Sequence, residues 1–191
     1  KVQALCGRWP TFEVQRQTPR AAPDGHERLV HDPKLQRQHI GLMSPAPSAQ
    51  DDQRYAAMLA ARVLGDDTGS RLFYALVEPG IVDEAVCMYD PLDGAGAFVS
   101  FICADPDEAP RALEIARGEM KRLMDDGCTE AELTAARNKT ASAVTVKGER
   151  PMGRLVAVGS DWVYRGEYVP LREHVESILA VTAEQVNAVS R

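Results

Sequence analysis

Two apolar segments joined by a strong turn signal constrain the fold of this chain more than any other feature. The segments are IVDEAVCMYD (residues 81–90) and GAFVSFICAD (residues 96–105), and Asp93-Gly94 lies between them. An Asp-Gly pair favours the tight turn of a β-hairpin, so we expect two antiparallel strands here. The second segment is apolar at both odd and even positions, which is typical of a strand buried on both faces. It is therefore predicted to be a central strand of a sheet.

The segments before the hairpin predict one more strand and two helices. A strand is expected over 38–44, because an apolar stretch there is ended by two prolines. A helix is expected over 48–65, with Ser48 as its cap. The stretch GSRLFYALVE (69–78) is short and helical in pattern, and Pro79-Gly80 ends it.

The segments after the hairpin are all helical in pattern. The clearest runs over 105–127, with Asp105 as N-cap and an apolar stripe at helical spacing. Four more helical segments follow, two of which open with the spacing of a capping box (129–148, 152–166, 170–181 and 182–191). This order predicts an α+β fold: an antiparallel or mixed β-sheet with helices layered on one face.

The 191 residues fit one domain with a piece of a neighbour. Residues 1–10 are interpreted as the last helix of a preceding domain, since Gly7 suits a helix end and Pro10 prevents continuation. Residues 11–37 are polar and proline-containing, which predicts a linker. Residues 38–191 form the predicted α+β domain. The chain begins with Lys in an apparent mid-helix, so we expect it to be part of a longer protein.

Composition excludes several classes of function. The formal net charge is −6 and the pI about 5.3, and no basic block is present, so we expect no nucleic-acid partner. No apolar run approaches the ~18 residues of a membrane span, so a soluble chain is expected. Its compartment stays open, with the bacterial cytoplasm and periplasm both compatible. The four cysteines include no Cys-x-x-Cys spacing and are expected to be reduced. A pairing of Cys87 with Cys103 stays open as the alternative, because the two fall in neighbouring predicted strands.

Local motifs for catalysis are missing from the sequence. No two of the four histidines lie four residues apart, so no helix presents a histidine pair to zinc. There is neither a G-x-S-x-G nucleophile elbow nor a P-loop lysine. Gly69, Ser70 and Arg71 keep one functional interpretation, because a loop before a helix offers backbone N–H groups to a peptide. The alternative is a plain connection between two helices.

Five stretches together resemble one family, the insulinase/pitrilysin-type zinc metallopeptidases in the branch of the bacterial and mitochondrial processing proteases. The resemblance lies in their order and spacing across most of the chain. The stretches are ALCGRWP (4–10), the strand–helix–SRLF segment (37–73), PGIVDEAV (79–86), the strand–helix–TEAEL segment (101–138) and VTAEQVNAV (181–189). In that family each half is a pair of α+β domains, and one of the two carries an H-x-x-E-H zinc helix.

The absence of H-x-x-E-H from this chain implies, through the resemblance, a metal-free domain. Zinc is then expected in a partner domain or subunit of the same family. Active members place an Arg and a Tyr against the substrate backbone, and these positions fall at Val77 and Asp83. Val77 offers no hydrogen-bond donor, and Asp83 would oppose an oxyanion. Tyr74 and Tyr89 lie nearby in sequence and would substitute only with a shifted backbone.

The resemblance leaves two functional hypotheses of different classes. In the first, this is a non-catalytic domain of a zinc metalloendopeptidase that shapes the substrate chamber and adds peptide to a sheet edge. Its contacts with peptide would then include Gly69, Ser70 and Arg71. In the second, it is a degenerate family member that serves only in assembly. Independent activity of this chain is not expected, because no acid, base, nucleophile or metal set is present in it.

Overall fold

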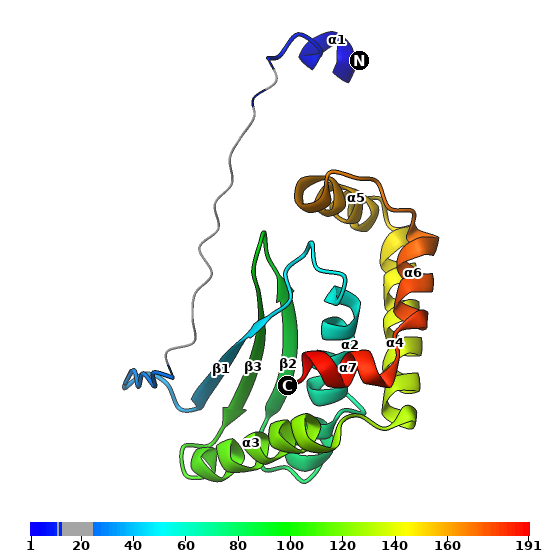
Figure 1. Ribbon diagram of the computed structural model, residues 1–191. Helices are drawn as coiled ribbons and strands as arrows, with labels where there is room; N and C mark the ends of the chain where they lie inside the picture. Colours follow the sequence, from blue (N-terminus) through cyan, green and yellow to red (C-terminus); the bar gives the residue numbers. More distant parts are fainter. Residues whose placement is uncertain (11, 13–24) are drawn as a thin grey trace.

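The computed structural model describes residues 1–10, 12 and 25–191 (Figure 1). Helix α1 (Val2–Cys6) forms near the N-terminus and contains no buried residue. The predicted linker over 11–37 lies partly outside the described residues. Its described part, 25–37, contains turns but neither helix nor strand before β1 begins at Gln38. The division of the chain into a preceding helix, a linker and a domain stays a prediction.

The sheet has three antiparallel strands among the described residues, in the order β1–β3–β2. The strands are β1 (Gln38–Ala46), β2 (Glu84–Pro91) and β3 (Gly96–Ala104). Strands β2 and β3 form the expected hairpin, with Pro91 opposite Gly96 next to the turn. Strand β3 is the central strand, as its two apolar faces predicted. Strand β1 lies at an edge of the sheet.

Helices lie on one side of this sheet (Figure 1), which confirms the predicted α+β class. Between β1 and the hairpin the chain forms one long helix and a single π-helical turn, α2 (Arg54–Gly65) and η1 (Phe73–Val77). After the hairpin come five helices: α3 (Ala109–Asp126), α4 (Glu130–Glu149), α5 (Pro151–Arg165), α6 (Leu171–Ala180) and α7 (Ala183–Val189). The core lies between the inner sheet face and this helical layer. Its fully buried large side chains are Leu59, Leu72, Leu76, Ile102, Leu133, Ile178 and Val186.

Two predicted helix starts are wrong, and both errors have a local cause. Helix α2 begins at Arg54 rather than after Ser48, because the Asp51 carboxylate accepts a hydrogen bond from the Gln53 N–H (2.8 Å) and stabilises a turn first. Helix α3 begins at Ala109, since the N–H groups of Glu108 and Ala109 both donate to the Asp105 carbonyl in a turn that comes first. The two predicted capping boxes, at Thr129 and Thr182, are present.

Candidate functional site

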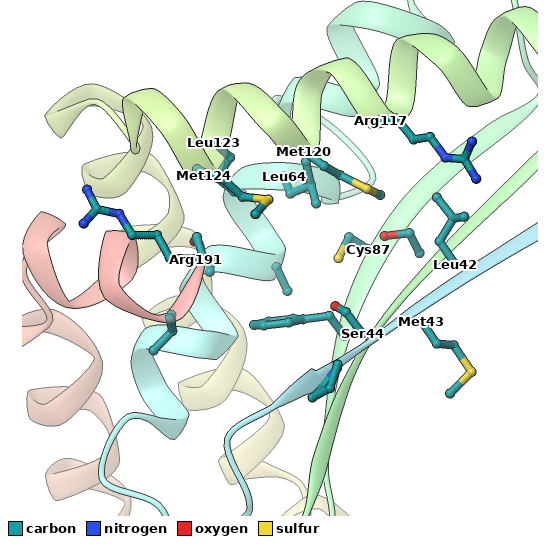
Figure 2. Close-up of a pocket in the computed structure, with 17 residues that line it drawn as sticks. Leu42, Met43, Ser44, Leu64, Cys87, Arg117, Met120, Leu123, Met124 and Arg191 are labelled. Carbon is teal, nitrogen blue, oxygen red and sulfur yellow. The ribbon is translucent and has the colours of Figure 1, made fainter. Parts of the chain in front are cut away.

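An apolar cavity of about 520 Å³ lies beneath the edge strand β1. It is enclosed by β1, α2, α3 and the end of α7 (Figure 2). Leu42 of β1 and Phe98 of β3 form its sheet side, and Leu64, Met120 and Leu123 form its helical side. Leu42 faces this cavity, and the exposed side chain of Met43 also borders it. The cavity therefore has room for an apolar group beside β1.

Three of the polar residues that border the cavity lie on the sheet, namely Ser44, Cys87 and Ser100. Cys87 and Ser100 are buried on the inner sheet face. Burial raises the pKa of the Cys87 thiol, so the thiol stays protonated and is a poor nucleophile. Arg117 is exposed on α3 and extends toward β1 (Figure 2). The cavity thus offers an apolar space with a cation beside it.

The predicted substrate loop is held firmly against the rest of the domain. Ser70 is buried, and its hydroxyl donates to the Asp66 carbonyl (2.7 Å). The Lys139 ammonium of α4 pairs with Asp66 (2.9 Å) and Asp67 (2.7 Å). The hydrogen bond from the Lys139 ammonium is the largest cause that lowers the pKa of Asp67 to about 2. Gly69 completes the turn with a φ of +76°, a left-handed conformation that favours glycine.

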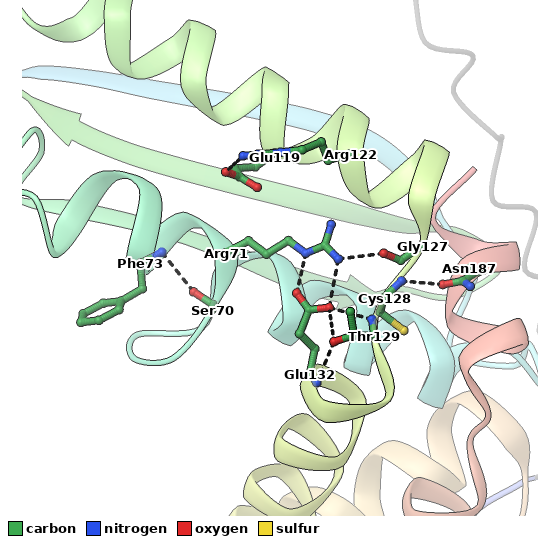
Figure 3. Close-up of polar contacts among 10 residues, drawn as sticks. All are labelled: Ser70, Arg71, Phe73, Glu119, Arg122, Gly127, Cys128, Thr129, Glu132 and Asn187. Atoms are coloured by element: carbon green, nitrogen blue, oxygen red, sulfur yellow. Dashed lines mark hydrogen bonds and ion pairs between the residues drawn. The ribbon is translucent and has the colours of Figure 1, made fainter.

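Arg71 is bound within the domain rather than directed into solvent (Figure 3). Its Nε donates to Glu132 (2.7 Å), and its Nη2 donates to the Gly127 carbonyl (2.7 Å) and again to Glu132 (3.0 Å). Glu132 also accepts from the backbone N–H of Thr129 (2.7 Å), which closes the capping box of α4. Arg71 therefore joins the loop before η1 to the junction of α3 and α4. Substrate contact by Gly69, Ser70 and Arg71 stays a prediction.

The Arg71–Glu132 pair makes a testable contribution to stability at low pH. Burial alone would raise the pKa of Glu132, but hydrogen bonds from Arg71 and Thr129 outweigh it and lower the pKa. A lowered folded-state pKa stabilises the fold above the unfolded value of about 4.3, and this stabilisation is lost as pH falls through the folded pKa. We expect the unfolding free energy of Glu132→Gln to fall less steeply than that of the wild type below about pH 5.

The measurement is urea unfolding over an acid pH series. Glu130→Gln serves as the control, because Glu130 is exposed on the same helix and pairs with Arg137 (3.1 Å). Parallel pH profiles for Glu132→Gln and the wild type would contradict the role given to this carboxylate.

The positions at which the resemblance expects Arg and Tyr are occupied by groups with structural contacts. Val77 ends η1 and packs half-buried against the core. Asp83 precedes β2 and pairs with Arg37 (3.0 Å), which also pairs with Asp105 at the end of β3. Asp83 thus belongs to an ion cluster at one end of the sheet, whereas Arg71 contacts the α3–α4 junction. These predicted residues do not form one site.

The two nearby tyrosines differ in their availability. The Tyr89 hydroxyl donates to the Pro47 carbonyl (2.8 Å), and burial is the main cause that raises its pKa to about 12. Tyr74 is exposed and packs edge-on against Phe73. Tyr89 is therefore a structural group, and only Tyr74 has a ring free to contact another molecule.

Sequence reasoning missed the residues that build the cavity. Leu42, Phe98 and Met120 look like ordinary core residues in the sequence, since each fits the apolar face of its own element. Only the chain topology places the β1 edge over the space between α3 and α7 (Figure 2). Among the described residues, no group of three or more His, Cys, Asp or Glu side chains is placed to hold a metal ion. No helix in the described part of the chain has the length and apolarity to cross a bilayer.

Residues 1–140 match the family described as the peptidase M16 inactive domain. The chain belongs to this family. A zinc protease from Mycobacterium bovis, named as uncharacterized, is 24% identical over 186 residues, which are 93% of this chain and 42% of that protein. The chain thus spans less than half the length of this curated relative. The match agrees with the family that the sequence resemblance indicated.

Two solved structures share this fold at low sequence identity. One is a chain of Complex III2 from Candida albicans, with a TM-score of 0.75 and 18% identity over 83% of this chain and 40% of that chain. The other is a peptidase M16 inactive domain from Pseudomonas fluorescens, with a TM-score of 0.68 and 19% identity over 81% of this chain and 37% of that chain. Both support the α+β architecture described above.

Proposed function

We propose that this M16 domain is a non-catalytic wall of the substrate chamber of a zinc metalloendopeptidase. It binds extended peptide, while zinc-dependent hydrolysis takes place on another domain or subunit of the same family. Membership of the inactive-domain family supports the non-catalytic part of this proposal. A zinc protease among its relatives supports the enzyme class of the parent.

The observation that carries the peptide-binding part is an edge strand that lies directly over an apolar cavity. An edge strand such as β1 presents backbone N–H and C=O groups to which an extended peptide adds as a further strand. Alternate side chains of that peptide point to the inner face of the sheet, where the cavity of about 520 Å³ lies. A bulky apolar side chain fits a space of this size and lining. Backbone pairing supplies affinity, and the cavity supplies selectivity.

A matched pair of substitutions on β1 separates peptide binding from general effects on the strand. Leu42 lines the cavity, whereas His39 is exposed on the same strand, stacks on Phe101 and does not line the cavity. We expect Leu42→Gln to weaken binding of leucine-containing peptides roughly tenfold, since a polar amide replaces apolar contact in the cavity. His39→Gln should bind as the wild type does. Fluorescence anisotropy of labelled peptides measures both, and equal losses in the two variants would contradict the cavity's role.

The likeness to a chain of Complex III2 favours a second candidate function. In that case the domain serves only in assembly with other subunits. Zinc content and cleavage of a quenched-fluorescent peptide library, measured on the full-length parent and on this chain, separate the two. Zinc and turnover in the parent alone support the chamber-wall function. A parent with neither supports the assembly function, and stoichiometric zinc in this chain alone overturns both.

A further inference from the structure

The cavity beneath β1 is bordered by positive charge and by no carboxylate side chain of the described residues. The charged side chains that line it are Arg117 of α3 and Arg191, the last residue of this chain. Arg191 also bears the terminal carboxylate of this chain, which offsets its guanidinium, so Arg117 supplies the net positive charge. The chain as a whole has a formal net charge of −6. The charge beside the cavity is therefore opposite in sign to that of the molecule.

Arg117 differs from its neighbours on α3 in having no acidic partner. Arg111 pairs with Glu108 (3.3 Å), and Arg122 pairs with Glu119. Within the described part of the chain, no hydrogen bond or ion pair joins Arg117 to another side chain. Arg117 is exposed and extends toward β1 (Figure 2). Its charge is therefore available to a molecule that lies against this strand.

The position of Arg117 matches the spacing of side chains on an added strand. Arg117 lies one helical turn before Met120, and both side chains line the cavity. Three residues of helix advance about 4.5 Å along the axis, and the long arginine side chain extends this reach. Side chains on one face of an extended peptide recur every second residue, about 7 Å apart. A peptide with an apolar side chain in the cavity thus brings the side chain two residues away within reach of Arg117.

The combination of an edge strand, an apolar cavity and one cation fits a peptide better than a small anion. A small anion would contact the guanidinium alone and would leave the cavity of about 520 Å³ unfilled. A purely apolar peptide would leave the guanidinium without a partner. Only a chain that carries an apolar and an acidic side chain on the same face complements all three features.

We propose that this domain binds extended peptides in which an Asp or Glu lies two residues from a bulky apolar residue, and that Arg117 selects the acidic residue. This inference rests on the proposed binding of peptide along β1. The apolar side chain occupies the cavity, and the carboxylate accepts two parallel hydrogen bonds from the Arg117 guanidinium. Because this ion pair is partly exposed, it raises the affinity by roughly fivefold rather than by orders of magnitude.

A set of capped, fluorescently labelled peptides in one threonine frame tests the spacing. The cores are Glu-Ser-Leu-Ser-Glu, its isomer Ser-Glu-Leu-Glu-Ser, and versions of the first core with Gln or Lys in place of Glu. The two isomers have the same composition and charge, but the isomer turns its carboxylates to the opposite face. By anisotropy, on this chain and on the full-length parent, the first core should bind about fivefold tighter than its isomer and the Gln version.

Substitutions on α3 test the residue. Arg117→Glu should prefer the Lys core to the Glu core, and Arg117→Gln should bind the Glu and Gln cores equally. Arg111→Glu is the matched control, because Arg111 is exposed on the same helix and does not line the cavity; it should keep the wild-type preference. Thermal unfolding of each variant confirms that it is folded.

The outcomes separate this inference from the proposed function. Equal binding of the Glu and Gln cores by the wild type, or a Glu preference that survives in Arg117→Gln, overturns the inference and leaves peptide binding intact. Absence of binding by every core overturns both. Binding by this chain but not by the parent would show that another segment of the parent covers the groove, and tighter binding of an uncapped peptide ending in leucine would show that Arg117 binds a C-terminus. Either result overturns the inference.

Discussion

Replacement of Arg71 by Met should lower the free energy of unfolding by about 2 kcal/mol. The side chain of Arg71 is only 15% exposed and makes three hydrogen bonds to Glu132 and the Gly127 carbonyl. Methionine keeps much of the apolar stem but leaves a half-buried carboxylate without its cation. Urea unfolding measures the loss, and Arg111→Met is the control, because Arg111 forms an exposed pair with Glu108 that contributes little.

The same variant distinguishes a structural from a substrate-binding Arg71. If Arg71 acts only through Glu132, the folded fraction of Arg71→Met should bind peptide as the wild type does. Glu132→Gln should then cause a similar loss of stability, and the double variant should lose less than the sum of the two. A variant that remains fully stable but fails to bind peptide would show that Arg71 contacts substrate, as the sequence predicted.

Replacement of His174 by Leu should have the larger effect, on the order of 3 kcal/mol. The side chains of His174 and Asp161 are 18% and 11% exposed, so the variant leaves a buried carboxylate and the Tyr55 hydroxyl without their partner. Because a carboxylate only accepts hydrogen bonds, Nε2 carries the proton, and in the neutral ring Nδ1 accepts from Tyr55. The network joins α2, α5 and α6 through one side chain.

His39→Leu is the matched control for this prediction. His39 is exposed on β1 and stacks on Phe101, with ring centroids 5.5 Å apart. Its replacement should change the unfolding free energy by less than about 0.5 kcal/mol. Hydrogen exchange in His174→Leu should rise first in α5, since α5 loses the contact of its one buried residue. Equal unfolding free energies of the two variants would contradict the proposed role of His174 in holding α2, α5 and α6 together.

The fold was predictable where local signals agree with tertiary packing. Asp93-Gly94 fixed the hairpin, the two apolar faces of β3 predicted its central place, and Thr129 with Glu132 predicted the start of α4. The starts of α2 and α3 were predicted too early, since Ser48 and Asp105 also suit a turn before a helix. Capping residues and turn residues are chemically the same, so the sequence alone does not separate them.

The candidate site was less predictable because it depends on elements far apart in sequence. Ser70 and Arg71 are polar residues in a glycine-containing loop, which favoured a contact with substrate, but their partners Asp66 and Glu132 become visible only in the fold. His174 is bound between helices, and nothing local in its sequence indicates Tyr55 or Asp161 as partners. Helix α5 likewise buries Asp161 and exposes Leu155 and Trp162, whereas its apolar spacing alone would predict that the apolar side faces the core.

Amide hydrogen exchange of β1, with and without peptide, tests the central claim most directly. The probe is a short capped peptide with a central leucine, added to this chain and to the full-length parent. The account predicts slower exchange in β1 (Gln38–Ala46) in both proteins, and loss of this protection in Leu42→Gln but not in His39→Gln. Unchanged exchange in β1, or protection in this chain that is missing from the parent, would contradict a peptide-binding chamber wall.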